Sequence, residues 1–247
     1  MNLMNRQSSD YKIDLSREEA ISLSKSFLSN VFSWMFLALA ITALVSYWFS
    51  SSPQLMGYLY STGQTGTSPT ILGWIVFLSP LGFVLLMSFG FQKLSATALS
   101  TLFVVFAILL GMSLSSIFLI YTNESIFLTF AVTSGMFGLM ALIGYTTKTD
   151  LTKLGSILMM GLFGIIIAMI VNMFLGSAQL DYIISIIGVI IFTGLTAYDV
   201  QMLKRIGMGV DYDHESTRKL VIIGALRLYL DFINLFLFLL RFLGNRR

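Results

Sequence analysis

Seven stretches of about 20 apolar residues divide most of this chain, and they constrain its fold more than any other feature. A bilayer core of about 30 Å needs about 20 apolar residues for one helical crossing. We place the stretches near residues 31–49, 71–91, 96–121, 126–145, 155–175, 180–203 and 220–242. The sequence therefore predicts an all-α polytopic membrane protein with seven transmembrane helices.

Composition supports one membrane domain and little else. Hydrophobic side chains make up 56% of the 247 residues and charged ones only 11%, whereas soluble domains carry about 25% charged residues. The apolar stretches leave no room for a separate soluble catalytic domain. We expect residues 31–247 to form a single transmembrane domain. With a net charge of +3 scattered among loop ends, the chain has no basic stripe that would indicate a nucleic-acid partner.

The first thirty residues are polar, with four acids and four bases, and we interpret residues 1–30 as a cytoplasmic N-terminal segment. Ser16 to Glu19 has the S-x-x-E form of a capping box, and apolar residues then follow at roughly helical spacing. This pattern predicts a short interfacial helix. A solvated lead-in to the first transmembrane helix explains the same residues equally well.

Lysine and arginine in short loops tend to remain in the cytoplasm, and here they gather on one side of the membrane. The opposite loops, 50–70, 122–125 and 176–179, contain neither residue. We therefore predict a cytoplasmic N-terminus, and we interpret 50–70 as an ordinary polar loop. Seven crossings would place Arg246 and Arg247 outside, against the same rule. Either the tail is tolerated there or the last apolar segment does not fully cross.

Two aspartates, Asp199 and Asp231, lie inside the last two apolar stretches. An unpaired carboxylate at membrane depth costs about 2.5–3.5 kcal/mol on insertion scales, so such an acid is a candidate functional residue. The two stretches are joined by a short loop and must run antiparallel, which allows both acids to face one crevice at comparable depth.

If the two carboxyl groups meet, they titrate as a pair that shares one proton. Loss of that proton places two like charges close together, so that the helices separate or a cation enters. Among common ions calcium fits best, because it favours hard oxygen ligands and tolerates irregular coordination. Asp199 and Asp231 are thus a predicted pH sensor, ion pathway and transient calcium site.

A structural interpretation of the same acids remains open. Arg227 precedes Asp231 by four residues and can neutralise it on the same helical face. Asp199 can meet Lys204 or water, and we expect Asp181, at the start of its helix, to be solvated.

Four segments together resemble the Bax inhibitor-1 family, also called the transmembrane Bax inhibitor motif family, and especially its bacterial members. They are Gly-Met-Ser-Leu-Ser-Ser-Ile-Phe at 111–118, Gly-Tyr-Thr-Thr-Lys at 144–148, Thr-Gly-Leu-Thr-Ala-Tyr-Asp at 193–199 and Leu-Tyr-Leu-Asp-Phe-Ile-Asn-Leu-Phe at 228–236. The resemblance runs from about residue 30 to the C-terminus. It favours a bacterial inner membrane over an internal eukaryotic one.

That resemblance implies a bundle of six outer helices around a central C-terminal helix, acting as a pH-sensitive calcium leak channel. It implies that Asp199 and Asp231 form the proton-sensing pair and that Arg241 helps to close the pore. The family partner of that arginine is an acid on an early helix, and this chain has none between Glu19 and Glu124.

Two other classes of function compete with the channel. A non-conducting regulator that binds stress, cell-death or quality-control proteins in the membrane is compatible with the resemblance. An intramembrane aspartyl protease would share the Tyr198-Asp199 pair, but its second element is Gly-x-Gly-Asp, and this chain has Leu-Tyr-Leu-Asp at 228–231. The usual hydrolase and nucleotide-binding motifs are also missing. We therefore expect no enzymatic activity and no cofactor, with calcium as a transported ion only.

Overall fold

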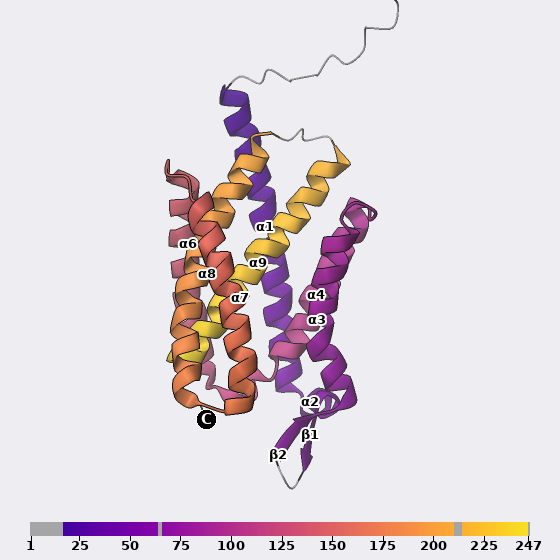
Figure 1. Ribbon diagram of the computed structural model, residues 1–247. Coiled ribbons are helices and arrows are strands. Elements are labelled where there is room, and N and C mark those ends of the chain that lie inside the picture. Colours follow the sequence, from indigo (N-terminus) through magenta and orange to yellow (C-terminus); the bar gives the residue numbers. More distant parts are fainter. Residues whose placement is uncertain (1–16, 64–65, 210–213, 247) are drawn as a thin grey trace, which may run out of the picture.

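The computed structural model describes residues 17–63, 66–209 and 214–246, and it shows a helical bundle with one small hairpin (Figure 1). Its elements, in chain order, are α1 Arg17–Ser51, α2 Pro53–Leu59, β1 Tyr60–Gly63, β2 Gly66–Pro69, α3 Ile71–Gly90, α4 Ala96–Leu114, α5 Ile117–Ile120, α6 Asn123–Thr146, α7 Thr152–Leu175, α8 Ala178–Gly207 and α9 Glu215–Leu243. Within these residues, seven helices are long and apolar enough to cross a membrane, with α4 and α5 together forming one crossing. The predicted all-α polytopic fold is confirmed.

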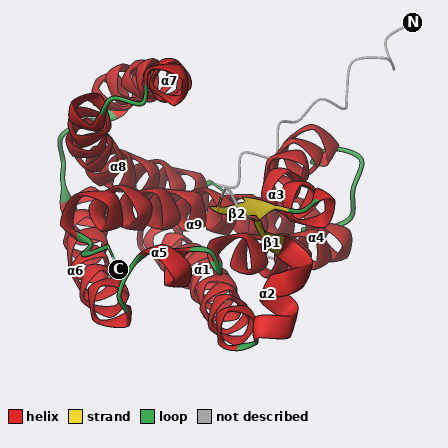
Figure 2. Ribbon diagram, turned by 90° about the horizontal axis from the view of Figure 1, so that it is seen from below, coloured by secondary structure: helices red, strands yellow, loops and turns green. Residues whose placement is uncertain are grey.

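The C-terminal helix α9 lies at the centre of the bundle and is the most buried of the crossing helices. It packs against α1, α4, α6 and α8, while α3 packs mainly on α4 and α7 mainly on α8 (Figure 2). In Figure 1, α9 runs obliquely behind the gap between α7 and α3. The predicted central position of α9 agrees with this arrangement.

Small residues allow the helices beside α9 to approach closely. A Cβ atom at Gly144 of α6 would overlap the backbone carbonyl of Ala197 on α8. A Cβ atom at Gly188 of α8 would lie 2.6 Å from the ring of Phe238 on α9. Glycine at such positions brings helix backbones into contact within a membrane, and here it sets how α6 and α9 pack against α8.

A buried polar contact joins α1, α4 and α9. The hydroxyl oxygens of Thr42 and Tyr229 lie 2.6 Å apart, and the Thr42 hydroxyl also lies 2.9 Å from the carbonyl oxygen of Ala107. The rings of Phe103 and Phe106 meet the Tyr229 ring edge to face, with centroids 5.8 and 5.5 Å away. Because hydrocarbon offers no alternative partner, this contact fixes the relative rotation of the three helices.

Three details of the N-terminal half differ from, or add to, the sequence predictions. Helix α1 is continuous from Arg17 through the first crossing, so the expected short interfacial helix is not a separate element; Ser16, its expected cap, lies outside the described residues. The connector 50–70 is not a plain loop, because it forms α2 and the β1–β2 hairpin. Tyr60 pairs with Pro69 and Ser61 with Ser68 in that antiparallel hairpin.

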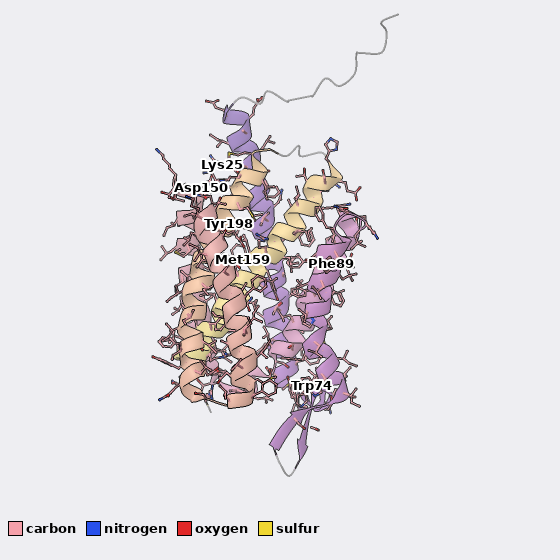
Figure 3. All side chains as sticks on the ribbon, viewed as in Figure 1. Lys25, Trp74, Phe89, Asp150, Met159 and Tyr198 are labelled. Atoms are coloured by element: carbon pink, nitrogen blue, oxygen red, sulfur yellow. The ribbon has the colours of Figure 1, made fainter. Side chains whose placement is uncertain are left out.

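The last helix crosses the whole bundle, which resolves the question raised by its basic tail. Lys25 and Asp150 mark one end of the molecule and Trp74 marks the other (Figure 3). Beyond α9 the chain reaches the Trp74 end, where the backbone N–H of Thr122 donates to the carbonyl of Asn245 at 3.1 Å. The N- and C-terminal ends of the bundle therefore lie on opposite sides of the membrane. A cytoplasmic N-terminus stays a prediction.

Candidate functional site

The structure brings Asp199 and Asp231 together. Asp199 lies on α8 and Asp231 on α9, and the two residues are only 4% and 5% exposed. The two carboxyl groups are close electrostatic neighbours of each other. An ionised carboxylate only accepts hydrogen bonds, so a bond between two carboxyl groups requires one proton. The geometry is that of two neighbouring buried acids, which can titrate as a pair.

The tilt of α9 explains how two acids at different positions along their helices meet. Asp199 lies eight residues before the end of α8 at Gly207, or about 12 Å along the helix, whereas Asp231 lies sixteen residues after Glu215, or about 24 Å. If the axes of α8 and α9 were aligned with each other, the depths of the two aspartates would differ by about 12 Å. Because α9 crosses the bundle obliquely (Figure 1), it descends less along the bundle axis for each residue. The two aspartates can therefore reach the same level.

Arg227 contacts the pair, but through Asp199 and not through Asp231 as its spacing predicts. Its Nη1 donates to Oδ1 of Asp199 at 3.1 Å, and the side chains of the two partners are 44% and 6% exposed. The reason is geometric, since the guanidinium reaches across to α8 instead of running along its own helix. Asp231 keeps one oxygen, Oδ2, buried without a hydrogen-bond partner among the described residues.

Lys204 is not the partner of Asp199 either. Its Nζ donates to the backbone carbonyl of Tyr145 at 2.8 Å and lies 4.7 Å from the centre of the same residue's ring. A cation near an aromatic face at the end of a crossing helix anchors that helix end against its neighbour. Lys204 thus joins α8 to α6, and in the described part of the chain Arg227 is the cation that contacts the acid pair.

The acid pair lines a cavity of about 690 Å³ bounded by α3, α4, α7, α8 and α9. Most of its polar lining lies on one stripe of α9, namely Arg227, Asp231, Asn234 and Arg241, and Asp199 of α8 and Ser88 of α3 complete it. Spacings of four, three and seven residues keep these side chains on one face of a helix with 3.6 residues per turn. The rest of the lining is mainly aliphatic, so the cavity is apolar apart from these side chains.

An ion pair closes the far end of the stripe. Nη1 of Arg241 donates to Oδ1 of Asp181 at 3.1 Å, and the guanidinium lies 5.8 Å from the centre of the Phe238 ring. The expectation that Asp181 is merely solvated is therefore wrong. The family partner of the arginine was expected on an early helix. Here the acid that contacts Arg241 comes from the first turn of α8.

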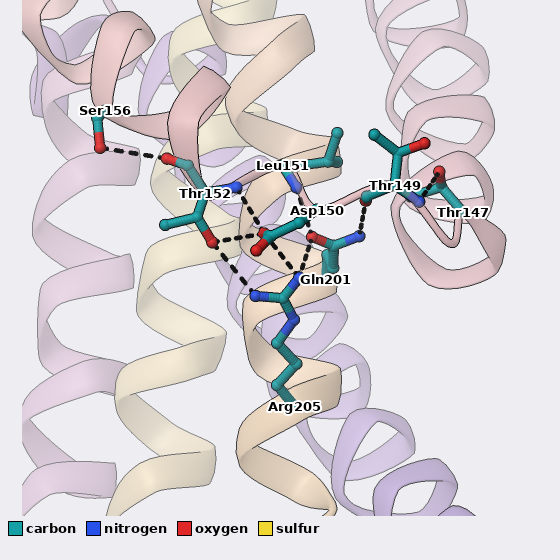
Figure 4. Close-up of polar contacts among 8 residues, drawn as sticks. All are labelled: Thr147, Thr149, Asp150, Leu151, Thr152, Ser156, Gln201 and Arg205. Carbon is teal, nitrogen blue, oxygen red and sulfur yellow. Dashed lines mark hydrogen bonds and ion pairs between the residues drawn. The ribbon is translucent and has the colours of Figure 1, made fainter.

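A network missed by the sequence analysis holds the C-terminal turns of α8 to the loop between α6 and α7 (Figure 4). Gln201 donates to the carbonyl of Thr149 at 2.8 Å and accepts from the N–H of Leu151 at 2.9 Å. Nη2 of Arg205 donates to Asp150 at 2.8 Å. The pKa of Asp150 is held well below its usual range, first by the hydrogen bonds from Thr152 and then by the Arg205 guanidinium.

This network begins two residues after Asp199, so it positions the helix that carries one member of the pair. A glutamine near the end of an apolar stretch gave no pattern from which this role could be predicted. Only the arrangement of α6, α7 and α8 shows what Gln201 contacts.

Comparison with known proteins follows the same motifs. The family described as "Inhibitor of apoptosis-promoting Bax1" matches residues 24–247. The chain belongs to the Bax inhibitor-1 family. The inner membrane protein YbhL of Escherichia coli K12 is 46% identical over 224 residues, which cover 90% of this chain and 93% of YbhL.

Two further relatives cover nearly the whole chain. A Borreliella burgdorferi protein is 44% identical over 236 residues, which are 95% of this chain and 99% of that protein. A Rickettsia prowazekii protein is 43% identical over 223 residues, with 90% and 91% coverage. This Bax inhibitor-1 family member is thus an integral membrane protein, and the resemblance inferred from its motifs is confirmed.

Proposed function

We propose that this protein is a pH-sensitive calcium leak channel of a bacterial inner membrane, gated by the proton that Asp199 and Asp231 share. One observation carries the proposal: two acids from different helices, both almost fully buried, line the same cavity at membrane depth. The location is supported by YbhL, which is named as an inner membrane protein.

The charges of the cluster explain how a proton would act as the switch. With one shared proton, the pair carries a single negative charge, which the adjacent Arg227 balances. Without that proton the cluster has a net charge of −1 and two carboxylates in contact. Separation of α8 from α9 or entry of a cation relieves this repulsion. Because α9 is the central helix, its displacement would alter contacts with all the helices around it.

Calcium is the cation we favour, as a passing ion and not as a resident one. It takes six to eight oxygen ligands, while two carboxyl groups supply at most four. Across the described residues, no group of three or more acidic, histidine or cysteine side chains is placed to hold a metal ion. A calcium ion at the pair would therefore keep part of its water and leave again, as conduction requires.

The Arg241–Asp181 ion pair is the contact that we propose closes the outer end of the ion pathway. Arg241 lines both the cavity that contains the acid pair and a second cavity beyond it, of about 420 Å³. A half-exposed guanidinium at that junction repels cations until its side chain moves. Arg227 and Arg241 thus act as modulators at the two ends of the pathway.

Calcium flux into proteoliposomes, recorded across pH, tests the proposal. Asp231→Asn keeps the shape of the side chain but removes one titrating group, so the pH dependence of calcium flux should be lost. Glu124→Gln is a matched control, because it changes an exposed acid of α6 outside the pair and should leave the flux profile unaltered. Unchanged flux and an unchanged pH response in Asp231→Asn would refute the channel. A cellular phenotype retained after replacement of both acids would favour a non-conducting regulator.

A further inference from the structure

We propose that the cavity between α3 and α7 binds one acyl chain of a membrane phospholipid, whose phosphate is held at the outer end by Arg241 and Arg246. The proposal goes beyond ion conduction and stands whether or not the protein conducts calcium. It assigns an occupant to a cavity whose lining includes two intramembrane acids.

The cavity opens sideways, toward the position of the bilayer. Leu81 of α3 and Ile166 of α7 both line it and are 63% and 39% exposed. Figures 1 and 2 place α3 and α7 apart on the same side of α9. The molecule that reaches such an opening at membrane depth is a lipid, because the hydrocarbon tails are the surrounding solvent there.

The walls suit a hydrocarbon chain. Apart from the polar stripe on α9, the lining is mainly leucine, isoleucine, methionine and phenylalanine, including Leu162, Ile165, Met169, Leu230 and Leu237. Flexible methionine side chains adapt to an irregular apolar ligand. An empty cavity of about 690 Å³ would forfeit dispersion contacts along all these side chains, which a lipid tail restores.

The part of the cavity between Asp231 and Arg241 lies within the reach of one lipid tail. Arg241 lies in the last turn of α9, near the expected membrane surface, and Asp231 lies ten residues deeper. Ten residues of helix span about 15 Å, which is half of a bilayer core of about 30 Å and hence the reach of one leaflet's tail. A tail that starts at Arg241 therefore ends beside the aspartate pair.

A polar cavity continues from the same arginine and suits a headgroup. Its lining includes Asn172, Ser177, Asp181, Arg241 and Arg246. The two guanidinium groups exceed the single carboxylate by one positive charge, and arginine is well suited to bind phosphate oxygens. An apolar cavity and a polar cavity that meet at Arg241 have the form of a site for an amphiphile.

Spin labels on single cysteines test what fills the apolar cavity, and the chain contains no cysteine to remove. Leu230→Cys and Leu237→Cys place labels on the central helix, where lipid arrives only through the opening. Ile167→Cys on the exposed face of α7 is the lipid-facing control, and Leu228→Cys at a fully buried position is the core control. The measurement is collision of each label with oxygen and with a water-soluble nickel chelate in liposomes.

We expect the two cavity labels to match Ile167→Cys, with high accessibility to oxygen and low accessibility to the nickel chelate. High nickel accessibility would show a water-filled cavity and overturn the proposal. Low accessibility to both reagents, as for Leu228→Cys, would also overturn it, because the occupant would then be protein. Either position alone suffices if the other variant does not fold.

Native mass spectrometry of the intact protein, released from phospholipid-containing micelles, tests the headgroup contact independently. We expect one retained phospholipid by mass and its loss in Arg246→Gln, with Lys148→Gln at the opposite end of the bundle as a charge-matched control that keeps it. Equal retention in the wild-type protein and Arg246→Gln would overturn the phosphate contact, as would retention of inorganic phosphate without lipid. These readouts contain no calcium flux, so their failure is distinguishable from failure of the proposed channel.

Discussion

Replacing Arg227 by glutamine removes the positive charge next to the aspartate pair while keeping a long polar side chain. If the pair shares one proton as proposed, the cluster is neutral in the native protein, and loss of that proton leaves it at −1. In Arg227→Gln the corresponding charges are −1 and −2. The variant should therefore hold its proton up to a higher pH, and any property that follows deprotonation should shift with it.

The structure sets the size of this shift. Two unit charges about 4 Å apart interact by about 4 kcal/mol at an effective dielectric constant of about 20. Because the Arg227 side chain is 44% exposed, water screens part of that interaction. The interaction energy between Arg227 and the acid pair therefore lies between two limits. Exposed ion pairs contribute about 0–1 kcal/mol, and removal of one partner of a buried pair costs about 3–5 kcal/mol. We take about 2 kcal/mol, and since about 1.36 kcal/mol corresponds to one pH unit, the midpoint should rise by about 1.5 pH units.

Calcium flux into proteoliposomes between pH 5 and pH 9 gives the midpoint directly. Arg227→Lys should restore much of the native value, because it returns the charge without the planar fork of arginine. Lys148→Gln removes an exposed positive charge in the loop between α6 and α7 and should leave the midpoint where it is. A midpoint that stays fixed or moves down in Arg227→Gln would show that the arginine does not act on the pair through its charge.

Two further predictions concern stability. Thr42→Val should destabilise the bundle by about 1–2 kcal/mol in a reversible unfolding assay, more than Tyr229→Phe, because it removes both contacts of the Thr42 hydroxyl and leaves the buried Tyr229 hydroxyl unpaired; equal losses would contradict that asymmetry. The pKa of Asp150 is lowered in the folded protein, so its contribution is complete above its ordinary pKa of 3.8 and is lost as the pH falls below that value. Asp150→Asn should abolish this acid-dependent part of the unfolding curve, and an unaltered curve would contradict it.

The features that could be predicted from the sequence are those that depend on segment length and on ionisable residues inside apolar segments. A crossing helix must be apolar for about 20 residues. This requirement located the crossing helices to within a few residues, except that α1 and α9 begin earlier and α8 ends later than predicted. An aspartate inside such a segment is costly enough to be conspicuous, so Asp199 and Asp231 could be singled out without coordinates. Their antiparallel helices made contact plausible.

The features that could not be predicted depend on helix rotation and tilt. Spacing along one helix assigned Arg227 to Asp231, yet the guanidinium contacts Asp199 on the neighbouring helix. Asp181 and Arg241 are 60 residues apart and meet only because α9 crosses the bundle beside the first turn of α8. The β1–β2 hairpin was hidden because its short uncharged strands, rich in serine, threonine and glycine, carry no apolar alternation.

The same rotation and tilt determine why α9 is suited to control the site. Its stripe from Arg227 to Arg241 faces the cavity, while its opposite side carries Tyr229, which is fixed to Thr42 of α1. A rotation of α9 that separated Asp231 from Asp199 would therefore have to break or carry along that hydroxyl contact. Deprotonation supplies a repulsion between two adjacent carboxylates, and the Thr42–Tyr229 contact opposes it. Weakening that contact in Tyr229→Phe should then ease opening, in addition to its effect on stability, which links the core of the bundle to the response of the acid pair.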